Sequence, residues 1–393
     1  MSRVYLDNNA TTPVAPEVAD AMVGYLREDF GNASSVHWYG QRARDAVEQA
    51  REQVARLIGA HPSEIIFTSG GTESDNMSLF GVVGAARAKA SAKHVITTAI
   101  EHPAVLYAAR ELESRGVGMT YVTTGPGAVI DADDVARAIR PETVLITVML
   151  ANNEVGTLQP VAEIGRVIRE HGITLHTDAV QAVGKVPLDV NSLGVDLLSL
   201  SAHKLYGPKG VGALYVRKGT HLEPLMHGGH HERDRRPGTE NVPGIVGLGK
   251  AAELAAERLE QDTQHIAALR DRLQAGIVER IAGVSINGEA TRRQPNTLNV
   301  SFEGLKGESL VMALDLEGVA CSTGSACSSG STEPSHVLSA MGLSREAARS
   351  SLRLSLGRYN TGVDVDVALE AIVRVVARLR ALSPHYAAAS VHA

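Results

Sequence analysis

The chain has 393 residues, of which 44% are hydrophobic and 21% are charged, and its net charge is -6. No apolar run approaches the roughly 18 residues of a membrane span, and no basic block points to nucleic acid or to an anionic membrane surface. The length is typical of one large and one smaller domain, and the charge pattern favours a small-molecule ligand.

The N-terminus and the cysteine content predict a cytoplasmic protein. Residues 1–6 run directly into a strand-like segment, without the basic region, apolar stretch or cleavage site of a secretory signal. Cys321 and Cys327 lie close together in one segment. This placement excludes a disulfide framework and fits a reducing compartment.

Short β-branched runs alternate with amphipathic helical stretches between residues 64 and 216. This alternation predicts an α/β fold with a largely parallel sheet, and such sheets bind ligands at the carboxyl ends of their strands. A helix that opens at Pro160 and closes near Gly172 is predicted to be a crossover. The expected strands are residues 65–68, 95–98, 144–148, 173–177, 197–200 and 211–216.

The pattern changes after about Pro243. A long helix rich in Ala, Leu, Glu and Arg is predicted from there to roughly Ile281, and a mixed region with a strand at residues 298–302 follows it. We therefore predict a domain boundary in this part of the chain. Residues 383–393 are small and polar without a period, which predicts a mobile tail.

A glycine-containing turn at residues 68–74 follows the first strand and precedes a helix. Gly70 and Gly71 let the backbone approach an anion, and a helix N-terminus offers free N–H groups with a partial positive charge. A phosphate fits such a turn. A plain strand-to-helix turn with Thr72 as N-cap explains the segment alone equally well. No Gly-Lys-Ser/Thr follows, so the turn is not a Walker A loop.

Two later strands end in ionisable residues, Asp178 and Lys204. A lysine that follows a buried strand is partly desolvated, which lowers its pKa and makes its amine a better nucleophile. Pyridoxal phosphate needs such a lysine for its Schiff base and a carboxylate at its pyridine nitrogen. Asp178 and Lys204 meet both needs, and an ion pair at the rim of the sheet is the alternative.

Residues 320–331 are rich in Gly and Ser and contain both cysteines. This composition predicts a flexible, exposed loop. A thiol on such a loop can ionise and reach a substrate, whereas a cysteine in an apolar core is inert. A metal site is the rival interpretation. The spacing of Cys321 and Cys327 is not that of a zinc finger, however, and the histidines of residues 227–231 have no further ligand at suitable spacing.

Taken together, these segments resemble the cysteine desulfurases, a branch of the class V aminotransferase-like, fold-type I pyridoxal-phosphate enzymes. The resemblance implies a mostly parallel seven-stranded sheet flanked by helices, plus a smaller α+β domain. It assigns residues 14–256 to the large domain, and residues 1–13 and 257–393 to the small one. The most specific matching segments are residues 5–13, 101–106, 151–157, 176–181, 199–204, 235–241, 320–331 and 351–358.

The resemblance also assigns roles around the ring of the cofactor. It implies that Lys204 holds pyridoxal phosphate as a Schiff base and that Asp178 pairs with the ring nitrogen. His102 would stack on the ring and shuttle protons. Gln181 and Asn153 would contact the ring hydroxyl region or the substrate.

Further implied roles concern the phosphate and the substrate carboxylate. Thr239 would reach the phosphate of a neighbouring subunit, which makes the site a property of a homodimer. Arg353 would grip the substrate carboxylate through two parallel hydrogen bonds. Within the subunit, the implied phosphate-binding residues are Gly71, Thr72, Ser201 and His203.

Each of these residues has a structural alternative when it is taken singly. His102 and His203 could be hydrogen-bonded core histidines, Thr239 a turn residue, and Arg353 a member of a surface ion pair. The order in which the residues occur along the chain favours the functional interpretation.

The implied reaction converts L-cysteine to L-alanine. Lys204 would remove the α-proton, and the Cys327 thiolate would take the substrate sulfur as a persulfide for an iron–sulfur scaffold or another acceptor protein. Cys327 could contact a nascent iron–sulfur cluster during transfer, but no resident metal is expected. Cys321 is expected to be structural or an accidental second thiol.

The long cysteine loop indicates the group of desulfurases with an extended loop and not the group with a short one. The matching segments favour the nitrogen-fixation type over the housekeeping type. A selenocysteine lyase or a related class V aminotransferase would share Lys204 and Asp178, although an aminotransferase needs no Cys327. A non-catalytic scaffold or sensor that only retains the cofactor is a further alternative.

Overall fold

The structure is a computed structural model that describes residues 3–86, 93–323 and 333–382. Cys327 and the tail at residues 383–393 therefore lie outside the described residues. No helix within the described ranges is both long enough and apolar enough to cross a bilayer.

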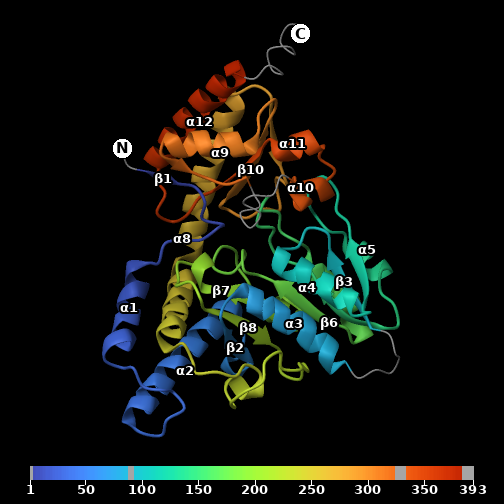
Figure 1. The fold of residues 1–393 in the computed structure, drawn as a ribbon, viewed down its shortest axis with the longest axis vertical. Helices are drawn as coiled ribbons and strands as arrows, with labels where there is room; N and C mark the ends of the chain where they lie inside the picture. Colours follow the sequence, from blue (N-terminus) through green and yellow to red (C-terminus); the bar gives the residue numbers. More distant parts are fainter. Residues whose placement is uncertain (1–2, 87–92, 324–332, 383–393) are drawn as a thin grey trace.

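A seven-stranded sheet with the order β2-β8-β7-β6-β5-β3-β4 forms the centre of the larger part of the molecule (Figure 1). β3 runs parallel to β4 and β5, and β6 runs parallel to β5 and β7, whereas β8 is antiparallel to β2 and β7. The expected α/β fold with a mostly parallel seven-stranded sheet is confirmed. The strands are β2 (Ile65–Thr68), β3 (His94–Thr98), β4 (Gly118–Val122), β5 (Thr143–Thr147), β6 (Thr174–Asp178), β7 (Leu197–Ser201) and β8 (Gly212–Val216).

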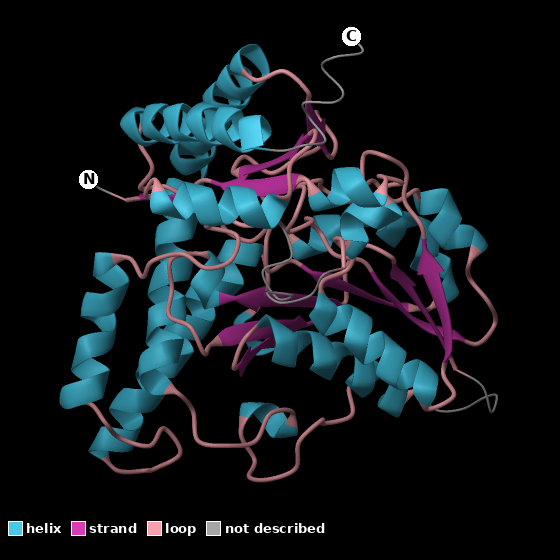
Figure 2. Ribbon diagram, turned by 45° about the horizontal axis from the view of Figure 1, so that its top comes forward, coloured by secondary structure: helices cyan, strands magenta, loops and turns pink. Residues whose placement is uncertain are grey.

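Helices cover both faces of this sheet (Figure 2). Side chains alternate between the faces along each strand. Ile66 and Leu145 therefore pack beneath α3 and α4, while Ile65 and Ile146 belong to the larger cluster on the opposite face. The helices of this part are α1 (Pro16–Arg27), α2 (Trp38–Ile58), α3 (Gly71–Ala85), α4 (Pro103–Ser114), α5 (Ala132–Arg137), α6 (Val161–Ile168) and α7 (Val190–Leu193).

A second core lies around the antiparallel sheet β12-β10-β9. It also includes the short parallel pair of β1 with β11, two strands that are far apart in the sequence. The strands are β1 (Val4–Tyr5), β9 (Val284–Asn287), β10 (Thr297–Phe302), β11 (Val319–Ala320) and β12 (Ser351–Ser355), and the helices are α9 (Gly307–Leu316) and α12 (Gly362–Leu382). Helices α10 (His336–Ala340) and α11 (Arg345–Arg349) bury Val337, Leu338 and Ala348 in the first core.

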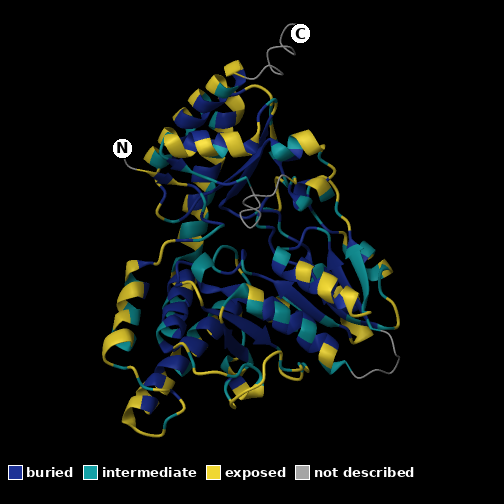
Figure 3. Cartoon of the chain, in the orientation of Figure 1, coloured by how far each residue is buried: buried dark blue, intermediate teal, exposed yellow. Residues whose placement is uncertain are grey.

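Helix α8 (Val242–Arg280) connects the two cores. Its residues from Val242 to Leu254 pack in the first core, and those from Ile266 to Ile277 pack in the second. The domain boundary expected between residues 256 and 257 falls within this helix, between the residues that pack in the first core and those that pack in the second. The central strands of the seven-stranded sheet are buried, whereas the edge strand β4 is only partly buried (Figure 3).

Candidate active site

A cavity of about 440 Å³ lies where β6 and β7 end, beside the N-terminal segment and Arg353 of β12. Polar side chains from both parts of the chain line it. Thr239 does not line this cavity and is exposed. The expected site residues on the cavity wall are Gly71, Thr72, His102, Asn153, Asp178, Gln181, Ser201, His203, Lys204 and Arg353.

One end of the cavity is suited to an anion. The chain turns there at Gly70, whose φ of 152° suits glycine, and α3 begins at the next residue. A Cβ atom at Gly71 would lie 2.6 Å from Val180 Cγ2, so a larger residue there would require Val180 to shift. Gly70 is the N-cap, and the alternative that made Thr72 the N-cap is wrong. Thr72 lies in the first turn, where free N–H groups attract anions.

Lys204 and Asp178 stand at the ends of adjacent strands. Lys204 lies in the short 3-10 turn after β7, and its Nζ donates to the carbonyl oxygens of Asn9 and Ala10, the latter at 2.7 Å. Asp178 ends β6 and accepts a hydrogen bond from the Val180 N–H at 2.9 Å. Burial raises the pKa of Asp178 to about 6, while that hydrogen bond and the charge of Lys204 act in the opposite direction.

His102 is the N-cap of α4, and its Nδ1 accepts a hydrogen bond from the Ala104 N–H at 3.2 Å. A neutral ring that accepts at Nδ1 carries its proton on Nε2. Burial lowers the pKa of His102 to about 4, and the positive charge of Lys204 adds to the effect. His102 is therefore a neutral imidazole at pH 7. Burial likewise lowers the pKa of His203 to about 4, and its Nδ1 contacts Thr11 Oγ1 at 3.2 Å.

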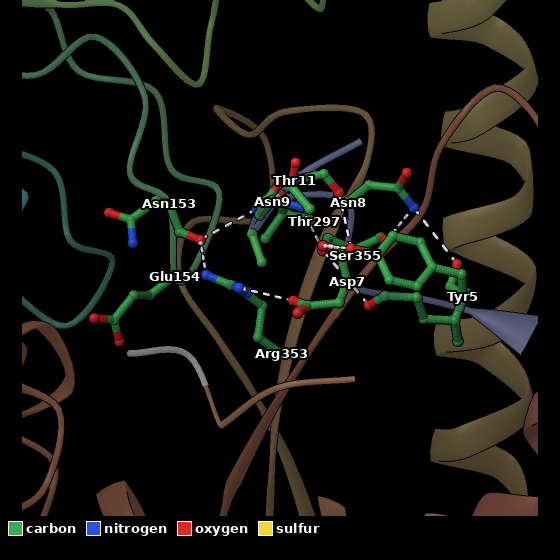
Figure 4. Close-up of polar contacts among 12 residues, drawn as sticks. Tyr5, Asp7, Asn8, Asn9, Thr11, Asn153, Glu154, Thr297, Arg353 and Ser355 are labelled. Carbon is green, nitrogen blue, oxygen red and sulfur yellow. Dashed lines mark hydrogen bonds and ion pairs between the residues drawn. The ribbon is translucent and has the colours of Figure 1, made fainter. Parts of the chain in front are cut away.

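Arg353 reaches the cavity from β12 and is held by the N-terminal segment (Figure 4). Its Nη2 donates to Asp7 Oδ1 at 2.9 Å, and its Nη1 donates to the Asn153 carbonyl at 3.0 Å. Only 2% of the Arg353 side chain is exposed, so the alternative of a surface ion pair is wrong. A buried guanidinium with a resident counter-ion is well placed to receive a second carboxylate.

Asn9 joins the two parts of the site and was not among the expected site residues. Its Nδ2 donates to Thr297 Oγ1 at 2.8 Å and to the Asn153 carbonyl at 3.1 Å (Figure 4). Its own carbonyl accepts from Gln181 Nε2 at 2.9 Å. Residues 5–13 form a matching segment with a polar run after a strand, but neither signal assigned Asn9 a role. Such contacts join residues far apart in the chain, and local patterns do not reveal them.

Two buried acids were also missed, of which Asp75 lines the cavity. Asp75 of α3 is 1% exposed, and burial together with the charge of Asp178 raises its pKa well above the usual range. Glu101 is fully buried, accepts from the Thr98 hydroxyl and the Met149 N–H, and has its pKa raised by burial to about 8. Glu101 lies in a segment that matches the desulfurases, but no sequence pattern distinguishes a buried acid from an exposed one.

Replacing Glu101 with glutamine is expected to stabilise the protein increasingly as the pH rises. The folded carboxyl binds a proton between pH 4.5 and about 8, whereas the unfolded carboxyl does not. The contribution of the protonated Glu101 to stability is therefore fully present below the pKa of the unfolded state, 4.5. It is lost as the pH rises through the pKa of the folded state, about 8. Glutamine does not titrate, so the free energy of unfolding should rise relative to wild type by up to about 1.4 kcal/mol per pH unit.

Urea unfolding of both proteins at several pH values across this window measures the difference. A difference in the free energy of unfolding that does not change with pH would contradict the assignment of a protonated Glu101.

The family follows from comparison with known proteins. Residues 4–367 match the class V aminotransferase family. The chain belongs to this family. It is 50% identical to the cysteine desulfurase IscS of Dictyoglomus turgidum, over 97% of this chain and 96% of that protein. It is 51% identical to the cysteine desulfurase IscS of Methanosarcina thermophila, over 97% of this chain and 94% of that protein.

Solved structures agree with the class V aminotransferase assignment. A NifS-like protein superposes with a TM-score of 0.90 at 40% identity, covering 95% of this chain and 99% of that one. The structure of SspA in complex with cysteine gives a TM-score of 0.81 at 40% identity, covering 91% of this chain and 100% of that one. The expected resemblance to cysteine desulfurases is confirmed. The relatives carry both IscS and NifS-like names, so the nitrogen-fixation subtype stays a prediction.

Pyridoxal phosphate is the cofactor of this class V family, and the residues of the cavity fit it. The glycine turn at the start of α3, with Ser201 and His203 nearby on the cavity wall, offers a phosphate cradle. Lys204 supplies the amine and Asp178 the carboxylate that the ring requires.

Proposed function

We propose that this chain is a pyridoxal-phosphate-dependent cysteine desulfurase, which converts L-cysteine to L-alanine and collects the sulfur on Cys327. The observation that carries the proposal is the convergence of Lys204, Asp178, His102 and Arg353 on one cavity. The identity of about half the sequence with enzymes named cysteine desulfurases, over nearly the whole chain, supports the choice of substrate.

Each residue has a task in this reaction. Pyridoxal phosphate, when bound, supplies an electron sink for negative charge at the substrate α-carbon. The Lys204 amine takes the α-proton, and the carbonyls of Asn9 and Ala10 hold that amine when it is not bound to the cofactor. Asp178 keeps the ring nitrogen protonated. The Nε2–H of His102 is a hydrogen-bond donor within the cavity.

The sulfur step uses Cys327, which lies outside the described residues. The Cys327 thiolate forms a bond to the substrate sulfur while the substrate carbon–sulfur bond breaks. Sulfur is thereby retained as a persulfide, and the carbon product takes up a proton and leaves as L-alanine. An aminotransferase would need no such thiol.

Brief exposure of the purified holoenzyme to L-cysteine, followed by mass spectrometry, tests the proposal. One added sulfur on the peptide that contains Cys327, with one alanine formed per sulfur, is the expected result. Alanine formation without sulfur on this peptide would exclude the Cys327 step, and the absence of alanine would exclude the reaction.

Replacing Arg353 with lysine is expected to raise the KM for L-cysteine by about tenfold or more, because hydrogen bonds to a charged group contribute about 1.5–3 kcal/mol. Lysine keeps a positive charge beside Asp7 but cannot form two parallel bonds to a carboxylate. The effect on kcat should be smaller, since Arg353 acts mainly on binding. Steady-state kinetics of alanine formation separate the two constants.

Arg358 provides a matched control for this prediction. It also forms a buried ion pair, with Asp262 at 2.7 Å, but it does not line the cavity. Arg358→Lys should change the KM by less than about twofold. An equal rise of KM in both variants would point to a general loss of structure and not to a carboxylate site.

The resemblance supports finer proposals. We propose a homodimer in which Thr239 completes the neighbouring phosphate site, and the exposure of Thr239 outside its own cavity supports this. An iron–sulfur scaffold or another acceptor protein would take the sulfur, with Cys327 contacting a nascent cluster during transfer. A cytoplasmic location and a role in nitrogen fixation complete the proposal.

A further inference from the structure

A second lysine lies behind the cofactor lysine. Lys185 follows β6 in a series of turns, and its Nζ donates to Gln181 Oε1 at 2.8 Å and to Asn9 Oδ1 at 3.4 Å. Both acceptors belong to residues that line the cavity. The backbone of Lys185 is itself fixed, because its carbonyl accepts from the Thr263 hydroxyl of α8 at 3.1 Å. The Lys185 amine therefore contacts the side-chain amides of Gln181 and Asn9 from a backbone that is held in place.

The amide of Gln181 has only one orientation that satisfies its neighbours. Its Nε2 donates to the Asn9 carbonyl at 2.9 Å, and its Oε1 accepts from Lys185. A flipped amide would place N–H donors against the donors of Lys185 and an oxygen against a carbonyl oxygen. One Nε2 hydrogen is used by Asn9, and within the described residues no other acceptor takes the second. That hydrogen is available to a group in the cavity.

The side chain of Asn9 is oriented in the same way. Its Nδ2 donates to the Asn153 carbonyl and to Thr297 Oγ1, which leaves Oδ1 to accept from Asn296 and Lys185. The amine of Lys185 therefore contacts the oxygen ends of two adjacent amides, and both amides direct their N–H groups away from it.

The electrostatic surroundings explain why an amine suits this position. Among the described residues, the hydrogen-bond partners of Lys185 are amide oxygens and include no carboxylate. Burial lowers the pKa of Lys185 well below its usual range, and the positive charges of Lys204 and Arg353 lower it further. A neutral amine still donates hydrogen bonds. Lys185 can thus hold the amides without adding a fixed charge beside Lys204.

We propose that Lys185 is a positioning residue, which fixes the amide of Gln181 so that its second Nε2 hydrogen is presented to an oxygen of the bound cofactor. The proposal rests on the proposed function, because it assumes pyridoxal phosphate in the cavity. Lys185 acts only through Gln181 and Asn9 and does not itself line the cavity.

A double-mutant cycle tests this role on the holoenzyme. Lys185→Met keeps the length of the side chain and removes its donor, and Gln181→Leu removes the amide. We expect Lys185→Met to move the absorption maximum of the bound cofactor and to raise the Kd for pyridoxal phosphate by about three- to tenfold, the effect of one hydrogen bond. In the Gln181→Leu background, Lys185→Met should add almost nothing, because the two changes remove one interaction.

The controls separate this role from a general effect. Lys209→Met removes an exposed lysine from the same edge of the sheet and should leave the absorption maximum unchanged. Lys185→Leu also removes the donor and replaces Lys185→Met in the cycle if the latter fails to fold. Additive shifts in the double variant, or a Lys185→Met spectrum identical to wild type, would overturn the proposal.

Failure of the proposed function would look different. Wild-type protein mixed with pyridoxal phosphate would then form no Schiff-base absorption band and no alanine. If the wild type shows the Schiff-base band and full activity, but the shifts of Lys185→Met and Gln181→Leu add in the double variant, only the role of Lys185 is overturned.

Discussion

Replacing Lys204 with alanine is expected to abolish the Schiff-base absorption band and to lower the rate of alanine formation by at least about 10³-fold, within the range that a positioned acid–base group contributes. The amine has two tasks in the proposed reaction, since it bonds the cofactor and takes the α-proton. Alanine can do neither. Absorption spectra of the purified variant and single-turnover measurements with L-cysteine provide the two readouts.

The contacts of Lys204 make this prediction specific. Its Nζ lies 2.7 Å from the Ala10 carbonyl in a cavity wall that also contains Asp178. Removing the side chain leaves the backbone of the turn in place, so the variant should fold and should still bind pyridoxal phosphate non-covalently. Lys209→Ala, at an exposed position in the same segment, is the matched control and should retain the band. A Lys204→Ala variant with a normal band would show that another amine holds the cofactor.

The sheet of the large domain was predictable because its strands are buried on both faces. Parallel strands covered by helices form continuous apolar runs, and each run predicted in residues 64–216 corresponds to a strand. β4 was missed. It lies at the edge of the sheet, begins with a glycine and is only partly buried, so it lacks the apolar run that identifies a central strand.

The cofactor side of the site was predictable for a related reason. Asp178 and Lys204 follow neighbouring parallel strands, and the carboxyl ends of such strands meet at one edge. The substrate side was accessible only through resemblance. Arg353 and Asp7 are 346 positions apart in the chain, and nothing local in either segment predicts their contact. The orienting contact of Lys185 with Gln181 is local, but a lysine among turn residues resembles a solvent-exposed one.

Replacing Cys327 with alanine is expected to abolish persulfide formation and to lower the release of sulfur from L-cysteine by about 10³-fold. The variant lacks the thiolate that attacks the substrate sulfur as the carbon–sulfur bond breaks. The Schiff-base band and its change on adding L-cysteine should persist, since Lys204, Asp178 and Arg353 are unaltered. Mass spectrometry and sulfide release in the presence of a reducing thiol measure the loss. Undiminished sulfide release by Cys327→Ala would rule out this thiol as the acceptor.

Cys321 gives this prediction a control within the same segment. Its thiol packs against the second core, and burial raises its pKa to about 12, with the negative charge of Asp7 adding to the effect. A thiol with such a pKa is almost wholly protonated near neutral pH and is a poor nucleophile. Cys321→Ala should therefore keep sulfur release within about twofold of wild type, apart from a modest loss of stability for a small cavity. If Cys321→Ala instead lost the persulfide while Cys327→Ala retained it, the roles of the two thiols would be exchanged, and sulfur transfer would have to begin from a partly buried thiol.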